Sequence, residues 1–156
     1  MPQRILVAMD DSDNAFRAVE LVAKNFSADN TVVLFHVMLD TAALCKMESP
    51  ELIPLFKSQQ TNFCALEDKK RELVTAAMNR ARELLVSSGF NEKAIEAKIE
   101  NKNKGVARDI LAEADKGYDL IVIGRRGLSG LKEFFLGSVS HKVFSGAKDI
   151  SVLIAN

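Results

Sequence analysis

The chain has 156 residues, of which 47% are apolar and 27% charged, a composition typical of one globular domain. Its 21 lysines and arginines balance 21 aspartates and glutamates, so no net positive field favours binding to nucleic acid or to an anionic membrane. No apolar run approaches the roughly 20 residues of a membrane span. Cys45 and Cys64 form no C-x-x-C pair, and we expect a cytoplasmic protein with two reduced thiols.

The amino-terminal part of the chain has the pattern strand, helix, strand. The continuously apolar run Ile5–Met9 is typical of a buried parallel strand. Residues 10–13 supply helix-capping side chains, and the apolar residues between 15 and 23 have the spacing of a helix that faces a sheet. The β-branched run Thr31–Val37 predicts the second strand.

A less regular insert separates this unit from a long amphipathic helix. Because Pro50 and Pro54 interrupt any long helix between residues 39 and about 60, we expect a mobile insert with one short helix there. Apolar residues between 66 and 85 then recur every three or four positions. This pattern predicts a helix with Gly89 as its carboxyl-terminal cap.

The second half of the chain supplies three more strands and two more helices. Residues 94–100 alternate between apolar and charged side chains, and one charged, solvated face suits an edge strand. Residues 105–117 have the pattern of an amphipathic helix, and residues 119–123 that of a buried strand. A helix from Gly137 to about Gly146 and a last strand at 150–155 complete the pattern.

Regular alternation of strands and helices indicates a parallel sheet with helices on both faces. Right-handed crossovers leave few topologies, and with the third strand at an edge the natural order is 3-2-1-4-5. The predicted fold is therefore α/β, a single doubly wound five-stranded parallel sheet. We expect one domain over residues 1–156, because no internal repeat or linker interrupts the chain.

A glycine motif follows the fourth predicted strand. Gly124 and Gly127 are separated by two residues, and after nine more residues Gly137 and Ser138 open the next helix. Backbone N–H groups at such a loop and helix start form a cradle for phosphate oxygens. The spacing is neither a Walker A loop nor a dinucleotide fingerprint, so the motif predicts a different kind of nucleotide site.

The predicted topology brings this motif to the usual ligand crevice. In order 3-2-1-4-5 the crevice lies between strands one and four, where Asp10 ends the first strand and Gly124 ends the fourth. Gly124 and Gly127 would adopt left-handed conformations beside the ligand, and the hydroxyls of Ser138 and Ser140 would donate to phosphate. Asp10 would contact a ribose hydroxyl or a phosphate-bound Mg²⁺, the one possible metal contact.

At these residues the chain resembles the universal stress protein family over almost its whole length. The ATP-binding branch of that family carries G-x2-G-x9-G-[ST], and this sequence has the motif intact. The resemblance extends to the opening run 5–12, to Phe35–Val37 and to 119–124. Two positions depart from the family: Ile150-Ser151 stands where a proline is common, and Arg126 where a histidine is common.

The resemblance implies a site for ATP, with Mg²⁺ carried by the phosphates, and ADP or AMP would fit the same cradle. It also implies a homodimer through the last strand, Ser151–Ala155, and treats residues 39–65 as a variable region. The residues it assigns to ATP are Ala8, Met9 and Asp10 beside the ribose and adenine, Val37 at the adenine edge, Ile123, Gly124, Arg126 and Gly127 along the ribose and phosphates, and Gly137, Ser138, Val139 and Ser140 around the phosphates.

The leading functional hypothesis is an ATP-binding regulatory protein of the stress response that works as a nucleotide-dependent switch. One alternative is a slow ATPase or phosphotransferase, although no committed base is evident besides Asp10. Another is a nucleotide-free protein-interaction module. His36 is expected to be a packed or edge histidine and His141 a helix-surface histidine, and the sequence identifies no partner protein.

Overall fold

The computed structural model describes residues 1–39, 41, 45, 54–125 and 136–156. Its strands are β1 (Arg4–Ala8), β2 (Thr31–Met38), β3 (Ile95–Asn101), β4 (Leu120–Gly124) and β5 (Ser151–Ala155). Its helices are α1 (Asp13–Asn25), α3 (Pro54–Ser87), α4 (Val106–Ala114) and α5 (Ser138–Gly146), with a short 3₁₀ turn at Glu92–Ala94. No helix in this part of the chain is long and apolar enough to cross a membrane.

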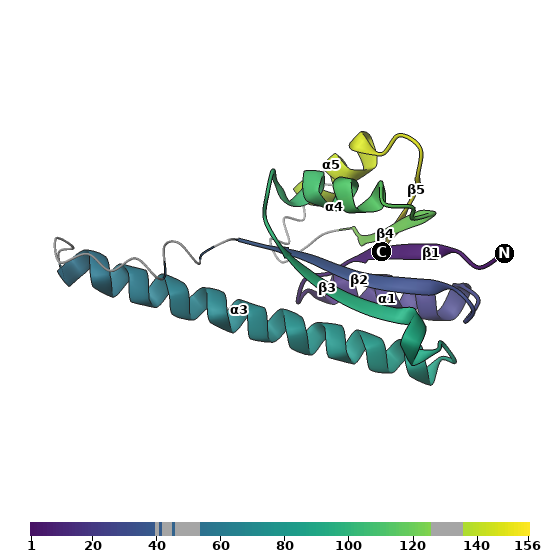
Figure 1. Ribbon diagram of the computed structural model, residues 1–156, viewed down its shortest axis with the longest axis horizontal. Coiled ribbons are helices and arrows are strands. Elements are labelled where there is room, and N and C mark those ends of the chain that lie inside the picture. The colour runs from purple at the N-terminus through teal and green to yellow at the C-terminus, as the bar shows by residue number, and fades with distance from the viewer. Residues whose placement is uncertain (40, 42–44, 46–53, 126–135) are drawn as a thin grey trace.

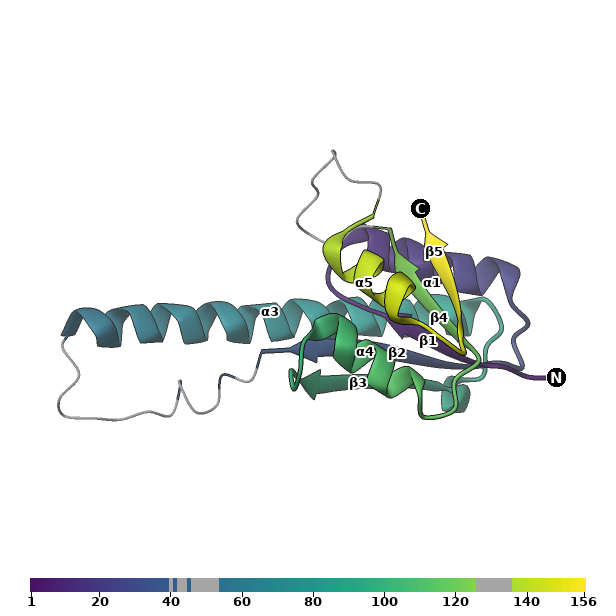
Figure 2. The same cartoon turned by 90° about the horizontal axis from the view of Figure 1, so that it is seen from above.

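The strands form one parallel sheet in the order β3-β2-β1-β4-β5. Helices α1 and α3 cover one face of the sheet, and α4 and α5 cover the other (Figures 1 and 2). The predicted fold class, the strand order and the edge position of β3 are therefore confirmed.

Two apolar cores lie on the two faces of the sheet, and the central strands contribute to both. On β2, Val32 and Leu34 pack toward α1 and α3, whereas Val33 and Phe35 pack toward α4. All four side chains are almost completely buried. A central parallel strand is covered on both faces, which explains why the apolar runs in the sequence are continuous rather than alternating.

The loop after β1 is held by two local hydrogen bonds. The Asp10 carboxylate accepts from the Ser12 N–H at 2.8 Å, and the Ser12 hydroxyl oxygen accepts from the Ala15 N–H at 3.1 Å. Ser12 is thus the amino-terminal cap of α1 and satisfies one of the helix's unpaired donors. The chain turns sharply here and leaves Asp10 at the carboxyl end of the sheet.

Helix α3 differs from the prediction, because it is 34 residues long and begins at Pro54. The expectation of a mobile insert with one short helix from residue 39 to about residue 60 is therefore wrong for residues 54–60. Proline needs no hydrogen-bond partner for its nitrogen in a first helical turn, so Pro54 starts the helix rather than breaking it. Of the remaining insert, residues 40, 42–44 and 46–53 lie outside the described residues.

Only the second half of α3 packs against the sheet. Its buried side chains begin at Val74 and end at Leu85, and the first half extends beyond the sheet in both views (Figures 1 and 2). Gly89 ends the helix with a φ of 102°, and the Phe90 N–H donates to the Leu85 carbonyl at 3.1 Å. The prediction of Gly89 as a left-handed cap is therefore confirmed.

The two cysteines form a disulfide, and the prediction of two reduced thiols is wrong. Cys64 lies on α3, and its Cα atom is 5.9 Å from that of Cys45. The bond closes a segment of 19 residues onto the projecting part of the helix. Because the chain contains neither a C-x-x-C pair nor a repeated cysteine spacing, the sequence gives no sign of this pairing.

Part of the charged face of β3 is covered rather than solvated. Lys98 is 2.7 Å from the carboxylate of Glu113 on α4, which also pairs with Lys116 at 2.7 Å and accepts from the Tyr118 hydroxyl at 2.8 Å. Burial by itself raises the pKa of Glu113, but these three donors outweigh it and bring the pKa down to about 2. Burial and the bond to Glu113 hold the pKa of Tyr118 well above its usual range.

Candidate functional site

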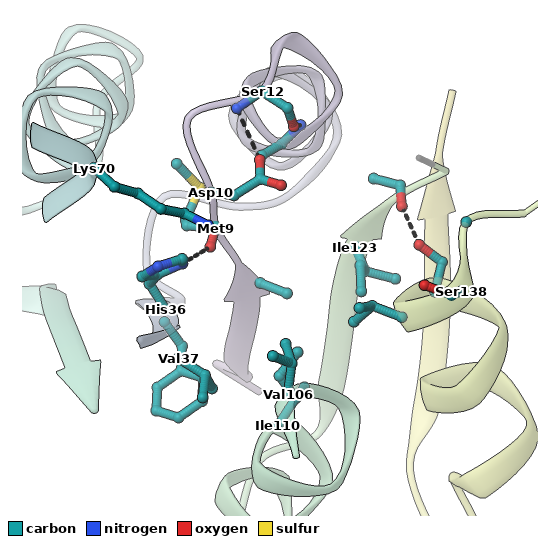
Figure 3. A pocket seen from close by; sticks show the side chains of 17 residues that line it. Met9, Asp10, Ser12, His36, Val37, Lys70, Val106, Ile110, Ile123 and Ser138 are labelled. Carbon is teal, nitrogen blue, oxygen red and sulfur yellow. Dashed lines mark hydrogen bonds between the residues drawn. The ribbon is translucent and has the colours of Figure 1, made fainter. Parts of the chain in front are cut away.

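A cavity of about 280 Å³ lies at the carboxyl end of the sheet, where β1 and β4 lead into their loops. Residues from β1, β2, α3, α4, β4 and α5 line it (Figure 3). This is the crevice that the strand order predicts. Of the twelve residues predicted from the sequence, ten line the cavity: Ala8, Met9, Asp10, Val37, Ile123, Gly124, Gly137, Ser138, Val139 and Ser140. Arg126 and Gly127 lie outside the described residues.

The cavity has two unlike ends. We call the side formed by Gly124 and by residues 137–140 the α5 end, and the side formed by Met9, Asp10, His36, Val37 and Lys70 the β2 end. Figure 3 shows Ser138 at the first and His36 and Lys70 at the second, with Val106 and Ile110 of α4 between them. The two ends differ in the groups that they offer to a ligand.

The α5 end offers backbone donors. Gly137 caps α5 and its N–H donates to the Arg125 carbonyl at 2.8 Å. No side chain of the described residues caps the helix, and the N–H groups of Ser138, Val139 and Ser140 have no backbone partner within its first turn. Together with the helix dipole, these groups attract an anion.

Gly124 is required by packing within the protein, not by a left-handed backbone. It has no positive φ, so the prediction of a left-handed conformation is wrong for this residue, and Gly127 lies outside the described residues. A Cβ atom at Gly124 would come within 2.7 Å of the Asn14 carbonyl oxygen on α1. Glycine is therefore needed because a helix backbone crosses the end of β4 at this point.

The Ser140 hydroxyl is also committed to the protein. It donates to the Gly124 carbonyl at 2.6 Å, and the residue is 4% exposed. A hydroxyl has one proton to donate, so the prediction that the Ser140 hydroxyl donates to phosphate is wrong in this arrangement. The neighbouring Ser138 side chain is exposed at the mouth of the cavity.

His36 is packed, as predicted, but it also lines the cavity, which the sequence analysis missed. It is 7% exposed, and its Nδ1 is 2.6 Å from the Met9 carbonyl oxygen. Since a carbonyl can only accept, Nδ1 carries the proton. Burial lowers the pKa of His36, and the bond to Met9 opposes this effect only in part, so the ring is neutral at pH 7. Its Nε2 is buried and has no hydrogen-bond partner among the described residues.

Lys70 brings a positive charge from α3 to the β2 end (Figure 3). The sequence analysis assigned it no role, although a signal was present. Lys70 lies four residues before Val74 and eight before Met78, so it continues the buried stripe of α3 one turn beyond the core. A cation on the apolar stripe of a helix indicates that the helix passes a site there. The cavity residues that sequence reasoning missed are Ser12, Ala15, Phe35, His36, Lys70, Val106 and Ile110.

The described residues contain no group of three or more histidine, cysteine, aspartate or glutamate side chains that could hold a metal ion. The arrangement instead combines an anion-attracting helix start with a partly apolar chamber. Phe35, Val37, Val106 and Ile110 supply the apolar walls. Such a cavity suits an elongated ligand that has a phosphate group at one end and a flat, partly apolar group at the other.

Comparisons with known proteins agree with this fold. The model of the universal stress protein family matches residues 1–155. Universal stress protein YxiE of Bacillus subtilis is 33% identical over 144 residues, which cover 92% of each chain. The structure of MJ0577, a test case for assigning biochemical function from structure, has a TM-score of 0.69 at 27% identity and covers 99% of this chain and 96% of its own.

A universal stress protein solved in complex with cAMP has the same fold. Its TM-score is 0.64 at 21% identity, and the match covers 99% of this chain and 97% of that chain.

Proposed function

The chain belongs to the universal stress protein family, and we propose that it is an ATP-binding regulator of the stress response, a nucleotide-dependent switch of the branch with the G-x2-G-x9-G-[ST] motif. The observation that carries this proposal is the cavity itself. It joins the uncapped amino terminus of α5 to an apolar chamber with polar edges at the end of β2. A nucleotide has this same division between phosphates and base.

In this proposal the phosphates bind at the α5 end. The N–H groups of Ser138 and Val139 donate to phosphate oxygens, and the dipole of α5 supplies favourable potential. Arg126 and Gly127 complete the contact from the loop before α5. Mg²⁺ arrives with the phosphates, because the protein offers it no ligand cluster of its own among the described residues. Among the described residues that line the cavity, the Asp10 carboxylate is the acidic group placed to approach it.

The base and ribose bind at the β2 end. Asp10 keeps one carboxylate oxygen on the Ser12 N–H and presents the other to the ribose hydroxyls, with the Ala8 and Met9 backbone beside it. The apolar walls of the cavity cover the faces of the adenine, and the Val37 backbone meets its edge. Binding at both ends would order the segments around the cavity, and this ordering is the proposed switch.

The proposed homodimer forms through β5. Within the described part of the chain this strand pairs with β4 alone and stands at an edge of the sheet. Its Val152, Leu153 and Ile154 side chains are partly exposed. An unpaired apolar edge is favourably covered by a second copy of the same strand.

The first test is direct. Protein purified without added nucleotide is denatured, and the released compounds are separated by anion exchange with ultraviolet detection. We expect ATP. ADP or AMP alone would favour the alternative of slow hydrolysis. An empty protein that also fails to bind ATP with Mg²⁺ would refute the proposal, and cAMP is included as a competing ligand in the binding assay.

Two variants of Ser138 test where the phosphates bind. An aspartate at the first position of a helix stabilises the helix, but at the α5 end it would repel a phosphate. We expect Ser138→Asp to weaken ATP binding at least tenfold without loss of thermal stability. Ser138→Asn is the neutral, matched control, and we expect it to stay within about threefold of the wild type. Equal ATP affinity in both variants would exclude phosphate binding at the α5 end.

A further inference from the structure

The backbone hydrogen bonds between β1 and β2 stop before the end of β2, which continues to Met38. Its last rung is the Met9 N–H, which donates to the Phe35 carbonyl at 2.7 Å. In a regular parallel ladder the next rung would run from the Val37 N–H to the Met9 carbonyl. That carbonyl instead accepts from His36 Nδ1 at 2.6 Å. The Met9 carbonyl oxygen thus bonds a side chain of β2, and among the described residues no bond from the Val37 N–H to it accompanies this contact.

The orientation of β2 places the Val37 backbone groups at the cavity. On the other side of the strand, the Met38 carbonyl accepts from the Lys102 N–H in the chain after β3. Successive residues of a strand direct their backbone groups to opposite sides, so those of Val37 face the side of β1. Because β1 has ended at Ala8, both groups of Val37 are left facing the cavity that Val37 lines.

We propose that His36 is a positioning residue for the ligand's base: by holding the Met9 carbonyl, it keeps the Val37 N–H and C=O available to read the base edge. This inference rests on the proposed nucleotide function. His36 acts through Val37 and itself makes no contact with the base.

The cost of the histidine supports a role beyond packing. Its Nε2 is buried, and no residue in the described part of the chain bonds it, an arrangement that folded proteins usually avoid. An apolar side chain of similar size would fill the same space without an unsatisfied atom, but it could not donate to Met9. The bond is also well protected from solvent, because His36 is only 7% exposed. The neutral ring carries its proton on Nδ1, the atom that donates to Met9.

The consequence is a preference between bases. The Val37 N–H needs an acceptor on the base and the Val37 C=O needs a donor beside it. Adenine offers this pair as its ring nitrogen N1 and its exocyclic amine. Hypoxanthine offers the reverse, an N1–H beside a carbonyl oxygen. His36 therefore favours ATP over inosine triphosphate, a nucleotide with identical phosphates and ribose.

The test compares the two nucleotides in two variants by calorimetry. His36→Leu removes the donor, so the Met9 carbonyl can take the Val37 N–H. We expect its ATP affinity to fall about tenfold and its affinity for inosine triphosphate to change less than threefold. His36→Asn restores an N–H near the position of Nδ1, and we expect the wild-type preference within threefold. Parallel losses for both nucleotides, or an unchanged preference in His36→Leu, would overturn the proposal.

A second measurement needs neither a variant nor a ligand. Amide hydrogen exchange of the wild-type protein should show a Val37 N–H that exchanges much faster than that of Val33, which lies within the paired part of β2. Equal protection of the two amides would overturn the role assigned to His36, even if ATP binds. Failure to bind ATP with a fast Val37 amide would instead refute the proposed function and leave the backbone arrangement intact.

Discussion

The two ends of the cavity are built in different ways. The α5 end consists of backbone groups on a helix start, and its single buried hydroxyl, on Ser140, is used within the protein. The β2 end consists of side chains and backbone groups from the loop after β1, from β2 and from α3, which are far apart in the sequence. Helix N–H groups recognise any phosphate, whereas an arranged set of side chains and backbone edges can discriminate. For the proposed nucleotide, we therefore expect affinity to come from the α5 end and selectivity from the β2 end.

The same difference determines how each end tolerates mutation. At the α5 end, Gly124 packs closely against the backbone of α1, and its carbonyl accepts from Ser140 of α5. At the β2 end, Lys70 is an exposed residue of α3 that lines the cavity. Substitutions at the two ends should therefore separate loss of stability from loss of ligand binding.

The largest effect is expected from Gly124→Ala. The new Cβ atom would lie 2.7 Å from the Asn14 carbonyl oxygen, a backbone atom that cannot move without shifting α1. We expect a loss of about 3 kcal/mol in the free energy of unfolding, measured by urea denaturation without nucleotide.

Gly146→Ala is the matched control for this substitution. Its Cβ atom would come equally close, 2.6 Å, but to the end of the Leu111 side chain, which can rotate away. We expect a cost below about 1 kcal/mol. If Gly124→Ala lowers the free energy of unfolding no more than Gly146→Ala, the first glycine of the motif is not required by packing. The α5 end would then resemble the β2 end in tolerating substitution without loss of stability.

The next effect separates two serines of the α5 end. Ser140→Ala leaves the Gly124 carbonyl without its 2.6 Å donor inside the protein, and we expect it to lower the free energy of unfolding by about 2 kcal/mol. Ser138→Ala, at an exposed position, should stay within about 0.5 kcal/mol. Equal thermal midpoints for the two variants would show that the Ser140 hydroxyl is not committed to β4.

The third effect is a pH dependence confined to the β2 end. Burial gives His36 a lower pKa in the folded protein than its ordinary 6.5, so the unfolded chain binds the proton more readily. The contribution of His36 to stability is therefore complete above pH 6.5 and is lost as the pH falls below that value toward the folded pKa. The slope cannot exceed about 1.4 kcal/mol per pH unit.

Lys70 of α3 and Asp10 and Asp11 of the loop after β1 act on His36 electrostatically, the first lowering its pKa and the other two raising it. The test uses His36→Asn, which keeps an N–H for Met9 but does not titrate.

The free energy of unfolding of the wild type and of His36→Asn is measured by urea denaturation between pH 7.5 and 5. The difference between the two proteins should shrink or change sign as the pH falls. A constant difference would mean that His36 is not desolvated. Glu113, with a pKa of about 2, loses its contribution at lower pH, between its ordinary 4.5 and 2.

The smallest effect is expected from Lys70→Ala. Removing one positive charge from the β2 end should weaken ATP binding about threefold and leave stability unchanged. Lys69→Ala removes the same charge from the adjacent position, where the lysine is 66% exposed and pairs loosely with Glu72 at 3.7 Å. An equal loss in both variants, measured by calorimetry at one salt concentration, would indicate a general charge effect rather than a contact in the cavity.

The fold could be predicted because its signals are local and repeated. Runs such as Thr31–Val37 identify buried strands, and Gly89 marks the end of a helix through a backbone angle that other residues rarely adopt. Pro54 shows the limit of such reasoning. The same residue that breaks a helix interior is favoured in a first turn, and the sequence does not say which position it occupies.

The site was predicted unevenly for a physical reason. Residues such as Gly137 belong to a motif of fixed spacing, which can be read along the chain. His36 lines the cavity because β2 ends beside it, and Lys70 lines it because α3 passes it. Both positions depend on tertiary packing. Even so, both had weak signals, a histidine at the carboxyl end of a strand and a cation on an apolar helix stripe.

The length of α3 has a consequence for how the molecule moves through solution. At 1.5 Å per residue, its 34 residues span roughly 50 Å, and the first half of the helix projects beyond the sheet (Figures 1 and 2). A rod attached to a compact body increases friction, so a single copy should sediment slowly and elute early from a sizing column. Its apparent mass from elution would then be close to that of a dimer. A method that does not depend on shape, such as light scattering or sedimentation equilibrium, is needed to determine the number of subunits.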